Sequence, residues 1–500
     1  MRDSIKLEMP LSRLAALAPE FDLAVIGGGI IGCGIARDAA QRGMRVVLFE
    51  KNDYGAGTTS GSTRLIHGGL RYLEMYDFGL VRMDLRERET MLRIAKGRIR
   101  PLRFLLPFYR SDLYQRLRIR AGMILYDLLS YDRSLPGSRM LSRKEALELE
   151  PGLNPDGLQG AASFYDAQVD MPEQLAAANI LDARRMGAIA LNYVEVTGAV
   201  RDAGRIAGVT VRDAITGETA GVRARVVVNA SGPWFDPVAG RIEGTDKVRI
   251  RTTKGIHLAC EPVVEQAHAV LSHIDGRLFF VIPWMGYTWV GTTDTDFEGD
   301  PGEACATPDD IDYLIKSAIA YFPKLAKADV YWTNAGVRAL VLRKGDPSSV
   351  SRMHRIDHSL GLVSVLGGKI TGYRAIAEDA VNAVAKAIGN NAACRSAIVP
   401  LPEPRAQLPD LETFVRQVVR EEQCMRAGDL LFRRTGLGFA PDQGRGIADN
   451  VIQWMADELK WSPERCAAES ALLDEHYNKT IGTERNTGTA ARKDRGLRGI

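Results

Sequence analysis

The sequence predicts an α/β fold built around a Rossmann-type nucleotide-binding domain whose parts are far apart in the chain. Three stretches of the 500 residues predict it, at 21–50, 222–236 and 358–388. Each begins with a short apolar run that leads into a turn of small residues, and the first and third continue into a helical pattern. Buried parallel strands have this continuous apolar character, and alternation with helices is typical of a parallel sheet.

The first stretch, Phe21 to Glu50, has the order strand, glycine turn, helix, strand, acid. Gly27, Gly29 and Gly32 fall on the GxGxxG spacing, which provides the tight turn, the close approach to a pyrophosphate and the close packing of helix on strand. Amides at the start of the helix then face the phosphates. Glu50 ends the second strand, where a carboxylate accepts from ribose hydroxyls, so an unphosphorylated ribose is expected, as in FAD or NAD.

The segment after Glu50 favours FAD over NAD. In place of further Rossmann repeats the chain continues as "KNDYGAGTTSGSTRLIHGG", a polar loop rich in glycine and hydroxyls. Such a loop suits a cofactor that lies extended and permanently buried, with hydroxyls bonding along it. The hydroxyl donors expected to do so are Thr58, Thr59, Ser60 and Ser62.

The second and third stretches add to the same domain. Val222 to Asp236 is a β-branched strand that ends in a turn of small residues, as expected where a backbone passes close to a ligand. In the third, Gly367 and Gly368 are predicted to begin the helix that carries Thr371, so that amides there face the pyrimidine edge of a flavin.

Composition excludes several classes of protein. The net charge of +3 is only weakly basic and does not indicate nucleic acid as a partner. The six cysteines include no CxxC pair, which fits a reducing cytoplasm, and no histidines or cysteines have metal-ligand spacing, so no metal is expected. Neither a signal peptide nor an apolar run of about 18 residues occurs, so the protein is expected to be soluble or to lie on a membrane surface.

Two further segments have their own character. Residues 408–434 and 447–476 carry apolar residues at helical spacing and predict a small helical bundle. Between Arg93 and Arg120, nine basic residues alternate with apolar and aromatic groups, against one acid, Asp112. That combination is typical of shallow contact with anionic lipid headgroups, although packing in a core would also produce it.

Six motifs together resemble the FAD-dependent glycerol-3-phosphate dehydrogenases of the aerobic, quinone-linked type. They are "VIGGGIIGCGIARDAAQRG", "STRLIHGGLRYLE", "VVNASGPW", "FFVIPWMGYTWVGTTDTDFEGDP", "NAGVRAL" and "GGKITGYR". The resemblance implies oxidation of sn-glycerol 3-phosphate to dihydroxyacetone phosphate by hydride transfer to FAD, with electrons passed to quinone. It also implies a cytoplasmic protein, peripheral on the inner face of the cell membrane, and leaves a homodimer open.

The resemblance implies a glutathione-reductase-like FAD-binding Rossmann domain with an inserted antiparallel-sheet substrate domain and a C-terminal helical domain. The expected limits are 21–75, 150–255 and 336–390 for the FAD-binding domain, 76–149 and 256–335 for the substrate, or cap, and membrane-contact domain, 400–477 for the helical domain, and 478–500 for a flexible tail.

The resemblance also assigns roles. His67 is the expected proton acceptor, since the ordinary pKa of imidazole suits that task near neutral pH. Arg338 and Lys369 are expected to stabilise negative charge on the substrate oxygen, and Lys369 also the reduced flavin. Guanidinium groups match phosphate in two-point geometry. The expected substrate-binding residues are Arg71, Tyr72, Thr293 and Arg352.

The expected cofactor contacts come from all parts of the FAD-binding domain and the loop that follows its first strands. They are Gly27, Gly29, Gly32, Glu50, Thr58, Thr59, Ser60, Ser62, Arg64, Leu65, Val196, Ala230, Gly232, Trp234, Gly368, Lys369, Ile370 and Thr371.

Three positions depart from the family pattern, and one of them leaves the substrate open. Ala339 stands where proline is usual, Arg64 where lysine is usual, and Gly372 where threonine is common. Extra room at Gly372 would admit a longer polyol phosphate, such as erythritol phosphate. The sequence is also compatible with an FAD-dependent amine or amino-acid oxidase, with a flavin-binding protein without turnover, and with oxygen in place of quinone as the acceptor.

Overall fold

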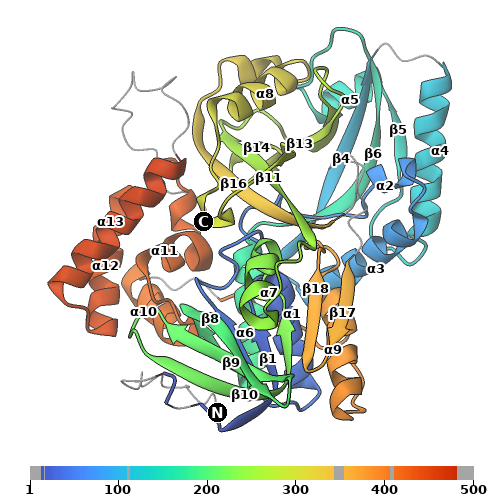
Figure 1. Ribbon diagram of the computed structural model, residues 1–500. Coiled ribbons are helices and arrows are strands. Elements are labelled where there is room, and N and C mark those ends of the chain that lie inside the picture. Colours follow the sequence, from blue (N-terminus) through green and yellow to red (C-terminus); the bar gives the residue numbers. More distant parts are fainter. Residues whose placement is uncertain (1–12, 16, 110–112, 343–353, 406–409, 481–500) are drawn as a thin grey trace.

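The computed structural model describes residues 13–480 except 16, 110–112, 343–353 and 406–409 (Figure 1). Most of the predicted tail at 478–500 therefore lies outside the described residues. The described chain forms two sheets with a group of C-terminal helices beside them (Figure 1).

The first sheet contains eight strands and has the order β17-β18-β10-β1-β2-β7 along its main path, with β9 joined to β10 and β8 to β9. The three strands predicted from distant stretches are neighbours here, because β10 pairs in parallel with both β1 and β18. This confirms the discontinuous Rossmann-type domain. Its strands are β1 (Glu20–Ile26), β2 (Val46–Glu50), β7 (Ile189–Asn192), β8 (Val194–Asp202), β9 (Arg205–Asp213), β10 (Thr219–Asn229), β17 (Arg355–Ser359) and β18 (Leu362–Leu366).

Helices α1 (Ile30–Gln41), α6 (Pro172–Arg185) and α9 (Tyr373–Ile388) pack together and share one apolar core with this sheet. Helix α9 begins later than the sequence predicts. Gly367 and Gly368 have φ of +72° and +107°, which a right-handed helix does not allow, so the helix starts only at Tyr373. Thr371 consequently lies in the loop before the helix.

The second sheet contains ten strands and is mainly antiparallel. Its long central ladders join β11 to β16 and β4 to β6. The strands are β3 (Leu65–Ile66), β4 (Ile99–Tyr109), β5 (Arg139–Ser142), β6 (Leu158–Val169), β11 (Ile250–Cys260), β12 (Ala267–Leu271), β13 (Leu278–Trp284), β14 (Tyr287–Gly291), β15 (Thr295–Asp296) and β16 (Val330–Val341).

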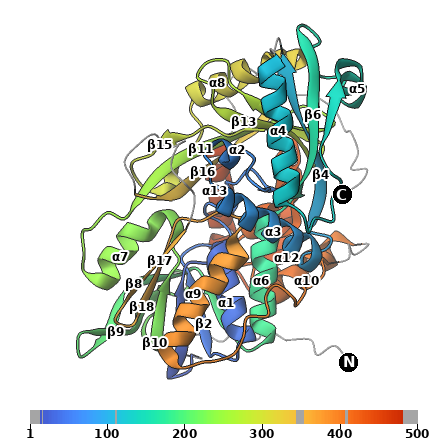
Figure 2. The same cartoon turned by 90° about the vertical axis from the view of Figure 1, so that its right-hand side faces the viewer.

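Further helices surround the second sheet or join it to the first (Figures 1 and 2). Helix α4 packs on β6 at the outer side of this domain (Figure 2). These helices are α2 (Arg71–Glu74), α3 (Phe78–Ile94), α4 (Leu113–Leu129), α5 (Arg143–Leu149), α7 (Phe235–Glu243) and α8 (Pro308–Ile319).

Strand membership differs from the predicted domain limits at several places. Strand β3 lies within 21–75 but pairs with β6 in the second sheet, and β11 and β16 cross the limits predicted at 255 and 336. Strand β6 lies within 150–255, which the sequence assigns to the nucleotide-binding domain, yet it belongs to the second sheet. The reason is its antiparallel ladder with β4, which runs from the Ile99–Val169 pair to the Tyr109–Leu158 pair.

The structure also contradicts part of the predicted lipid-contact segment between Arg93 and Arg120. Strand β4 occupies its middle, between β12 and β6, and Phe104 and Leu105 on it are 1% and 0% exposed. Those apolar residues serve the core, so the expectation of lipid contact is wrong for β4. The exposed apolar residues lie instead on α4, at Leu117, Ile124 and Leu128. No helix in the described part of the chain is long and apolar enough to span a bilayer.

The C-terminal residues form a helical group, as predicted, but both predicted helices are interrupted. The first breaks at Gln423, which is left-handed with φ of +56°. The second breaks at Lys460, with φ of +57°, and a new helix starts at Pro463, a residue that suits the first turn of a helix. The helices are α10 (Leu411–Glu422), α11 (Ala427–Asp429), α12 (Arg445–Leu459) and α13 (Pro463–Thr480).

A buried cluster of charges joins the helical group to the nucleotide-binding domain. Asp53, just beyond β2, accepts hydrogen bonds from Arg434 at 2.8 and 2.9 Å and from Arg433 at 2.7 Å. Asn192 at the end of β7 also donates to Asp53, at 3.0 Å. Asp53 and Arg434 have fully buried side chains. The helical group therefore holds the loop that follows β2.

Candidate active site

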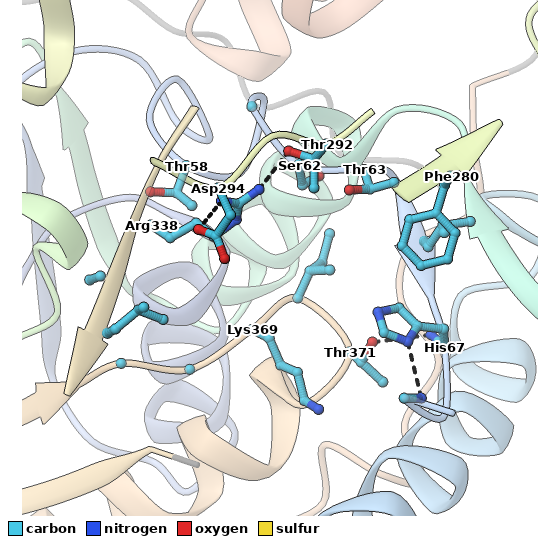
Figure 3. Close-up of a pocket in the computed structure, with 18 of the residues that line it drawn as sticks. Thr58, Ser62, Thr63, His67, Phe280, Thr292, Asp294, Arg338, Lys369 and Thr371 are labelled. Atoms are coloured by element: carbon cyan, nitrogen blue, oxygen red, sulfur yellow. Dashed lines mark hydrogen bonds and ion pairs between the residues drawn. The ribbon is translucent and has the colours of Figure 1, made fainter. Parts of the chain in front are cut away.

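A cavity of about 1090 Å³ lies where the two sheets meet. Its lining combines the glycine turn after β1, the end of β2, the loop at 57–73, β16 and the loop before α9. Figure 3 shows the part of the cavity where side chains from these segments face one another. A cavity of this size holds a dinucleotide and a small second ligand.

The nucleotide end of the cavity has the predicted geometry. Gly27 adopts φ of +102°, and a Cβ atom at Gly32 would lie 1.9 Å from the Gly27 carbonyl oxygen, so both positions require glycine. A Cβ at Gly29 would meet only the Thr59 hydroxyl, at 3.7 Å, and Gly29 lines the cavity. Gly29 thus leaves room for a phosphate beside the first turn of α1.

Glu50 lies at the carboxyl end of β2 and lines the cavity. Its carboxylate accepts from the amides of Gly28 at 2.6 Å and Asn52 at 2.7 Å. Burial raises the pKa of Glu50, and these two amides oppose the rise. The amides fix the carboxylate at the position where a ribose is expected.

The loop hydroxyls are used mainly to hold the loop itself. Thr58 donates to the carbonyl of Val337 at 2.5 Å, and Thr59 accepts from the Ile30 amide at 3.0 Å, capping α1. Both still line the cavity. Ser60 does not line it, because its hydroxyl is turned back to the carbonyls of its own loop.

Most of the other predicted cofactor residues lie on the cavity wall, and their contacts with a cofactor stay predictions. Gly32 and Arg64 are the further exceptions, since Gly32 acts through packing alone. The predicted residues on the wall are Gly27, Gly29, Glu50, Thr58, Thr59, Ser62, Leu65, Val196, Ala230, Gly232, Trp234, Gly368, Lys369, Ile370 and Thr371.

Arg64 is turned away from the cavity. Its guanidinium forms two hydrogen bonds to the Glu173 carboxylate, at 2.9 and 3.1 Å, and lies 4.6 Å from the centre of the Trp284 ring. The residue is 0% exposed. A guanidinium that is paired and stacked in this way is part of the core, so the expectation that Arg64 contacts the cofactor is wrong for its side chain.

Arg338 projects from β16 onto the cavity wall and is held there on two sides. It donates to the Asp294 carboxylate at 3.0 Å and to the Thr292 hydroxyl at 2.6 Å (Figure 3). Arg277, another wall residue, bonds the Asp294 carbonyl. The sequence reasoning missed Asp294, although it lies in the quoted "VGTTDTD" motif. It partly balances the Arg338 charge and fixes its direction.

Thr293 is not on the cavity wall, contrary to prediction. Its hydroxyl accepts from the Ile256 amide at 3.0 Å and is buried. Neighbouring Thr292 lines the cavity instead, because successive side chains of an extended segment point to opposite sides. Of the predicted phosphate ligands, Arg352 lies outside the described residues, and the side chain of Arg71 is not described.

His67 lines the cavity, and one of its ring nitrogens is already engaged. Nδ1 accepts a hydrogen bond from the Gly69 amide at 3.0 Å, and the His67 amide donates to the Thr371 hydroxyl at 3.2 Å. A neutral imidazole that accepts at Nδ1 carries its proton on Nε2. In this arrangement His67 presents a donor at Nε2 and has no free lone pair with which to accept a proton.

Lys369 reaches the wall from the loop before α9 and lies between the Arg338–Asp294 pair and His67 (Figure 3). Its ammonium is 4.6 Å from the centre of the Tyr72 ring and bonds to the carboxylate of Asp84 on α3. Tyr72 lines the cavity as predicted. Asp84 was missed, because it stands in a charged helical stretch with no motif of its own.

Away from the nucleotide end the cavity continues as an apolar arm, which we define by Leu106 and Phe108 on β4, Ile119 and Met123 on α4, and Leu278 on β13. Arg118 of α4 also lines this region. The arm therefore lies beneath the helix that carries the exposed apolar residues.

Gly372 does not line the cavity. A Cβ atom placed there would meet the Met83 side chain at 3.5 Å and the Ile376 side chain at 3.8 Å, both ordinary contacts. The absence of a side chain at Gly372 therefore gives no extra room to a substrate, and the reason for expecting a longer polyol phosphate is removed.

These features fit FAD. The Gly27–Gly29 turn would take the pyrophosphate, Glu50 the ribose, and the segment from Gly368 to Thr371 the flavin ring. The fold and the site define an FAD-dependent oxidoreductase. Among the described residues no group of three or more metal-binding side chains is present.

Comparison with known proteins gives the same class. Residues 22–374 match the family described as FAD dependent oxidoreductase, and residues 379–466 match the C-terminal domain of alpha-glycerophosphate oxidase. The chain is similar to a solved glycerol-3-phosphate dehydrogenase from Bacillus halodurans, complexed with FAD, at a TM-score of 0.75 and 28% identity, over 92% of this chain and 95% of that one.

Similarity to curated proteins identifies the family within this class of oxidoreductases. The chain is 39% identical over 464 residues to a glycerol-3-phosphate dehydrogenase of Synechocystis, covering 86% of this chain and 83% of that protein. It is 39% identical to glycerol-3-phosphate dehydrogenase 2 of Mycobacterium tuberculosis, covering 74% of this chain but 64% of that longer protein. The chain belongs to the family of FAD-dependent glycerol-3-phosphate dehydrogenases.

Proposed function

We propose that the protein oxidises sn-glycerol 3-phosphate to dihydroxyacetone phosphate and passes the electrons to a membrane quinone. FAD, when bound, supplies the acceptor for the hydride that leaves the substrate carbon. The observation that carries the proposal is the convergence of Lys369, Arg338 and His67, from three different segments, on one stretch of cavity wall.

The two cations suit a substrate that is an anion and develops further negative charge. Arg338, fixed by Asp294 and Thr292, offers donors in a set direction to an oxygen of the substrate. Lys369 stands across from it and adds a second positive charge. A phosphate dianion and an alkoxide-like oxygen are both stabilised by such a pair. Arg71, Tyr72 and Arg352 remain the proposed phosphate ligands.

His67 is proposed to orient the reacting hydroxyl. Its Nε2–H can donate to the hydroxyl oxygen, while the Gly69 and Thr371 contacts hold the ring in place. The sequence-based role of proton acceptor would require Nδ1 to give up its bond from the Gly69 amide.

Quinone as the acceptor is supported by the apolar arm. A quinone ring with an isoprenoid tail is a long apolar molecule, and the arm offers aliphatic and aromatic walls for it. The arm lies beneath α4, where Leu117, Ile124 and Leu128 are exposed beside Arg116 and Arg120. We propose that α4 rests on anionic lipid on the inner face of the membrane and admits quinone there.

The test is the visible spectrum of the purified holoenzyme, kept free of oxygen. Glycerol 3-phosphate is expected to bleach the flavin band, and glycerol, which lacks the phosphate, is expected to leave it unchanged. The reduced protein should then regain its band faster with a soluble quinone analogue than with air-saturated buffer.

A flavin band that resists glycerol 3-phosphate would overturn the substrate, and bleaching by an amino acid would identify an amino-acid oxidase in its place. Bleaching followed by faster recovery in air would retain the substrate and make oxygen the acceptor.

A further inference from the structure

Lys369 has a partner behind the cavity wall. Its ammonium bonds to Oδ2 of Asp84, which projects from α3 and is 0% exposed. A Cβ atom at Gly69 would lie 3.3 Å from the same carboxylate oxygen, so the Asp84 carboxylate lies directly behind the His67–Gly69 segment. Asp84 is therefore not a residue of the described cavity wall, but it bonds to Lys369, which is.

The two acidic residues near Asp84 each form an ion pair with an arginine. Asp166 on β6 bonds to Arg88 at 2.8 Å and also accepts from Tyr126 of α4. Glu87, one turn along α3, forms an ion pair with Arg374 at 2.7 Å.

Asp84 is different from these acids. Within the described part of the chain Lys369 is the only cation that pairs with it. Its second oxygen, Oδ1, is buried with no hydrogen-bond partner. A buried carboxylate with one partner is costly to keep ionised, so Asp84 is poised to take a proton.

The reaction needs such a group. Oxidation of an alcohol releases the hydroxyl proton as well as the two electrons and hydrogen of the C–H bond. The Nδ1 lone pair of His67 is occupied by the Gly69 amide, so the ring is not placed to receive that proton. Lys369 is on the wall, and Asp84 lies behind it.

We propose that Asp84 is the positioning residue of Lys369 and takes up the net proton that the reaction releases, with Lys369 as the relay. This inference rests on the proposed function. One N–H bond of Lys369 breaks as its proton forms an O–H bond on Asp84, and the nitrogen regains its lone pair. That lone pair then takes the hydroxyl proton.

The remaining changes in bonds and electrons take place on the substrate. The electron pair of the O–H bond becomes the second bond of the carbonyl as the C–H bond breaks, and that hydrogen leaves with its electron pair to the flavin. Lys369 ends as an ammonium and Asp84 as a neutral acid, which returns its proton to solvent before the next turnover.

The electrostatic environment of Asp84 agrees with this role. Burial raises the pKa of Asp84 to about 7, opposed by Lys369 and reinforced by the charges of Asp166 and Glu87. Two titratable groups from other elements contact its neighbours: the centre of the Tyr72 ring of α2 lies 4.6 Å from the Lys369 ammonium, and the Tyr126 hydroxyl of α4 donates to Asp166. Below about pH 7 Asp84 is already protonated and cannot accept, and above it the acceptor is ready.

The experiment is the rate of flavin reduction at saturating glycerol 3-phosphate, without oxygen, measured by stopped flow from about two pH units below 7 to two above. In the wild type the rate constant should fall about tenfold per unit below pH 7 and be level above it. Asp84→Asn should lower the plateau by about a hundredfold or more and remove the inflection near pH 7.

Two variants keep the test decisive. Asp84→Glu retains a carboxyl group and should recover part of the rate, with the inflection moved to a different pH. Glu87→Gln removes a buried carboxylate one turn away that bonds to Arg374. It should keep the plateau rate and an inflection, which moves only toward lower pH because one of the charges that raise the pKa of Asp84 is gone. Flavin absorbance per protein confirms equal cofactor loading.

An Asp84→Asn enzyme that keeps the inflection and a rate within about threefold of wild type would overturn the inference while the proposed function stands. If Asp84→Asn does not hold FAD, Asp84→Glu decides, and an unmoved inflection there overturns the inference. Failure of the wild type to be reduced at all would instead refute the proposed function.

Discussion

The hydrogen bond from the Gly69 amide to Nδ1 decides what His67 can do, since it fixes the neutral ring with its proton on Nε2. A glutamine side chain can place an amide N–H close to the position of Nε2, whereas an asparagine is too short to do so. We therefore expect His67→Gln to retain more turnover than His67→Asn, by about tenfold, because a hydrogen bond to a charged oxygen contributes about 1.5–3 kcal/mol.

The comparison is made on kcat for glycerol 3-phosphate with equal flavin content. If His67 were instead the proton acceptor, both variants would lose turnover equally, and added imidazole would restore part of it in each.

Single residues are also where the sequence predicted the site least well. Arginine and threonine often bind ligands, but in the structure the side chains of Arg64 and Thr293 form hydrogen bonds within the protein core. The sequence does not show which way a side chain points: Arg64 has a positive φ of +61°, and its side chain bonds to Glu173 inside the protein. Asp84 could not be found at all, because only the tertiary fold brings α3 next to Lys369.

Helix α4 is the element whose surface has the clearest consequence. Ile124 and Leu128 are 53% and 66% exposed and lie one turn apart on the same side of the helix. Replacing both by glutamate should weaken binding to vesicles that contain anionic lipid by at least about tenfold, since two apolar side chains lose their burial in the membrane. Co-sedimentation with such vesicles measures the effect.

A matched control exists on α13, where Leu472 is 39% exposed. Leu472→Glu should leave vesicle binding as it is. The α4 variant should also keep its rate of flavin reduction by glycerol 3-phosphate while losing turnover with quinone in vesicles. Undiminished co-sedimentation of the α4 variant would rule out this helix as the lipid contact.

Elements defined by local rules were predicted best. The strand, glycine turn and helix from β1 to β2 occur where the GxGxxG spacing places them, since each glycine has a local steric reason. Elements whose status depends on neighbours were predicted less well. The apolar run in β4 is compatible with either a membrane surface or a sheet interior, and only its pairing with β6 decides between them.

For the whole molecule, the junction between the helical group and the nucleotide-binding domain is the critical contact. Burial raises the pKa of Asp53, but Arg434 and Arg433 outweigh it and hold that pKa below its usual range. The ion pairs of Asp53 with the two arginines therefore stabilise the fold above about pH 4, and this contribution is lost as the carboxylate is protonated in acid. Arg434→Met should lower the free energy of unfolding by about 3–5 kcal/mol, because it removes one of the two guanidinium groups that compensate the buried Asp53 carboxylate.

Urea unfolding at neutral pH measures this loss, and the variant should also bind FAD more weakly because the loop beyond β2 is released. Arg420→Met is the control, since Arg420 is 58% exposed and its pair with Glu458 should contribute less than about 1 kcal/mol. Equal stability of the two variants would show that the Asp53 cluster does not join the domains.

The strand order of the first sheet has a consequence for how the chain is made. Strand β1 leaves the ribosome early, yet its neighbour β10, and β18 beyond that, are translated much later, and Arg434 later still. The emerging N-terminal segment must therefore wait with an unpaired strand edge, a state that attracts aggregation and chaperones. The cavity wall includes Gly367 to Thr371, so the complete flavin site exists only after these residues have been made, and flavin is expected to bind chains that extend beyond them.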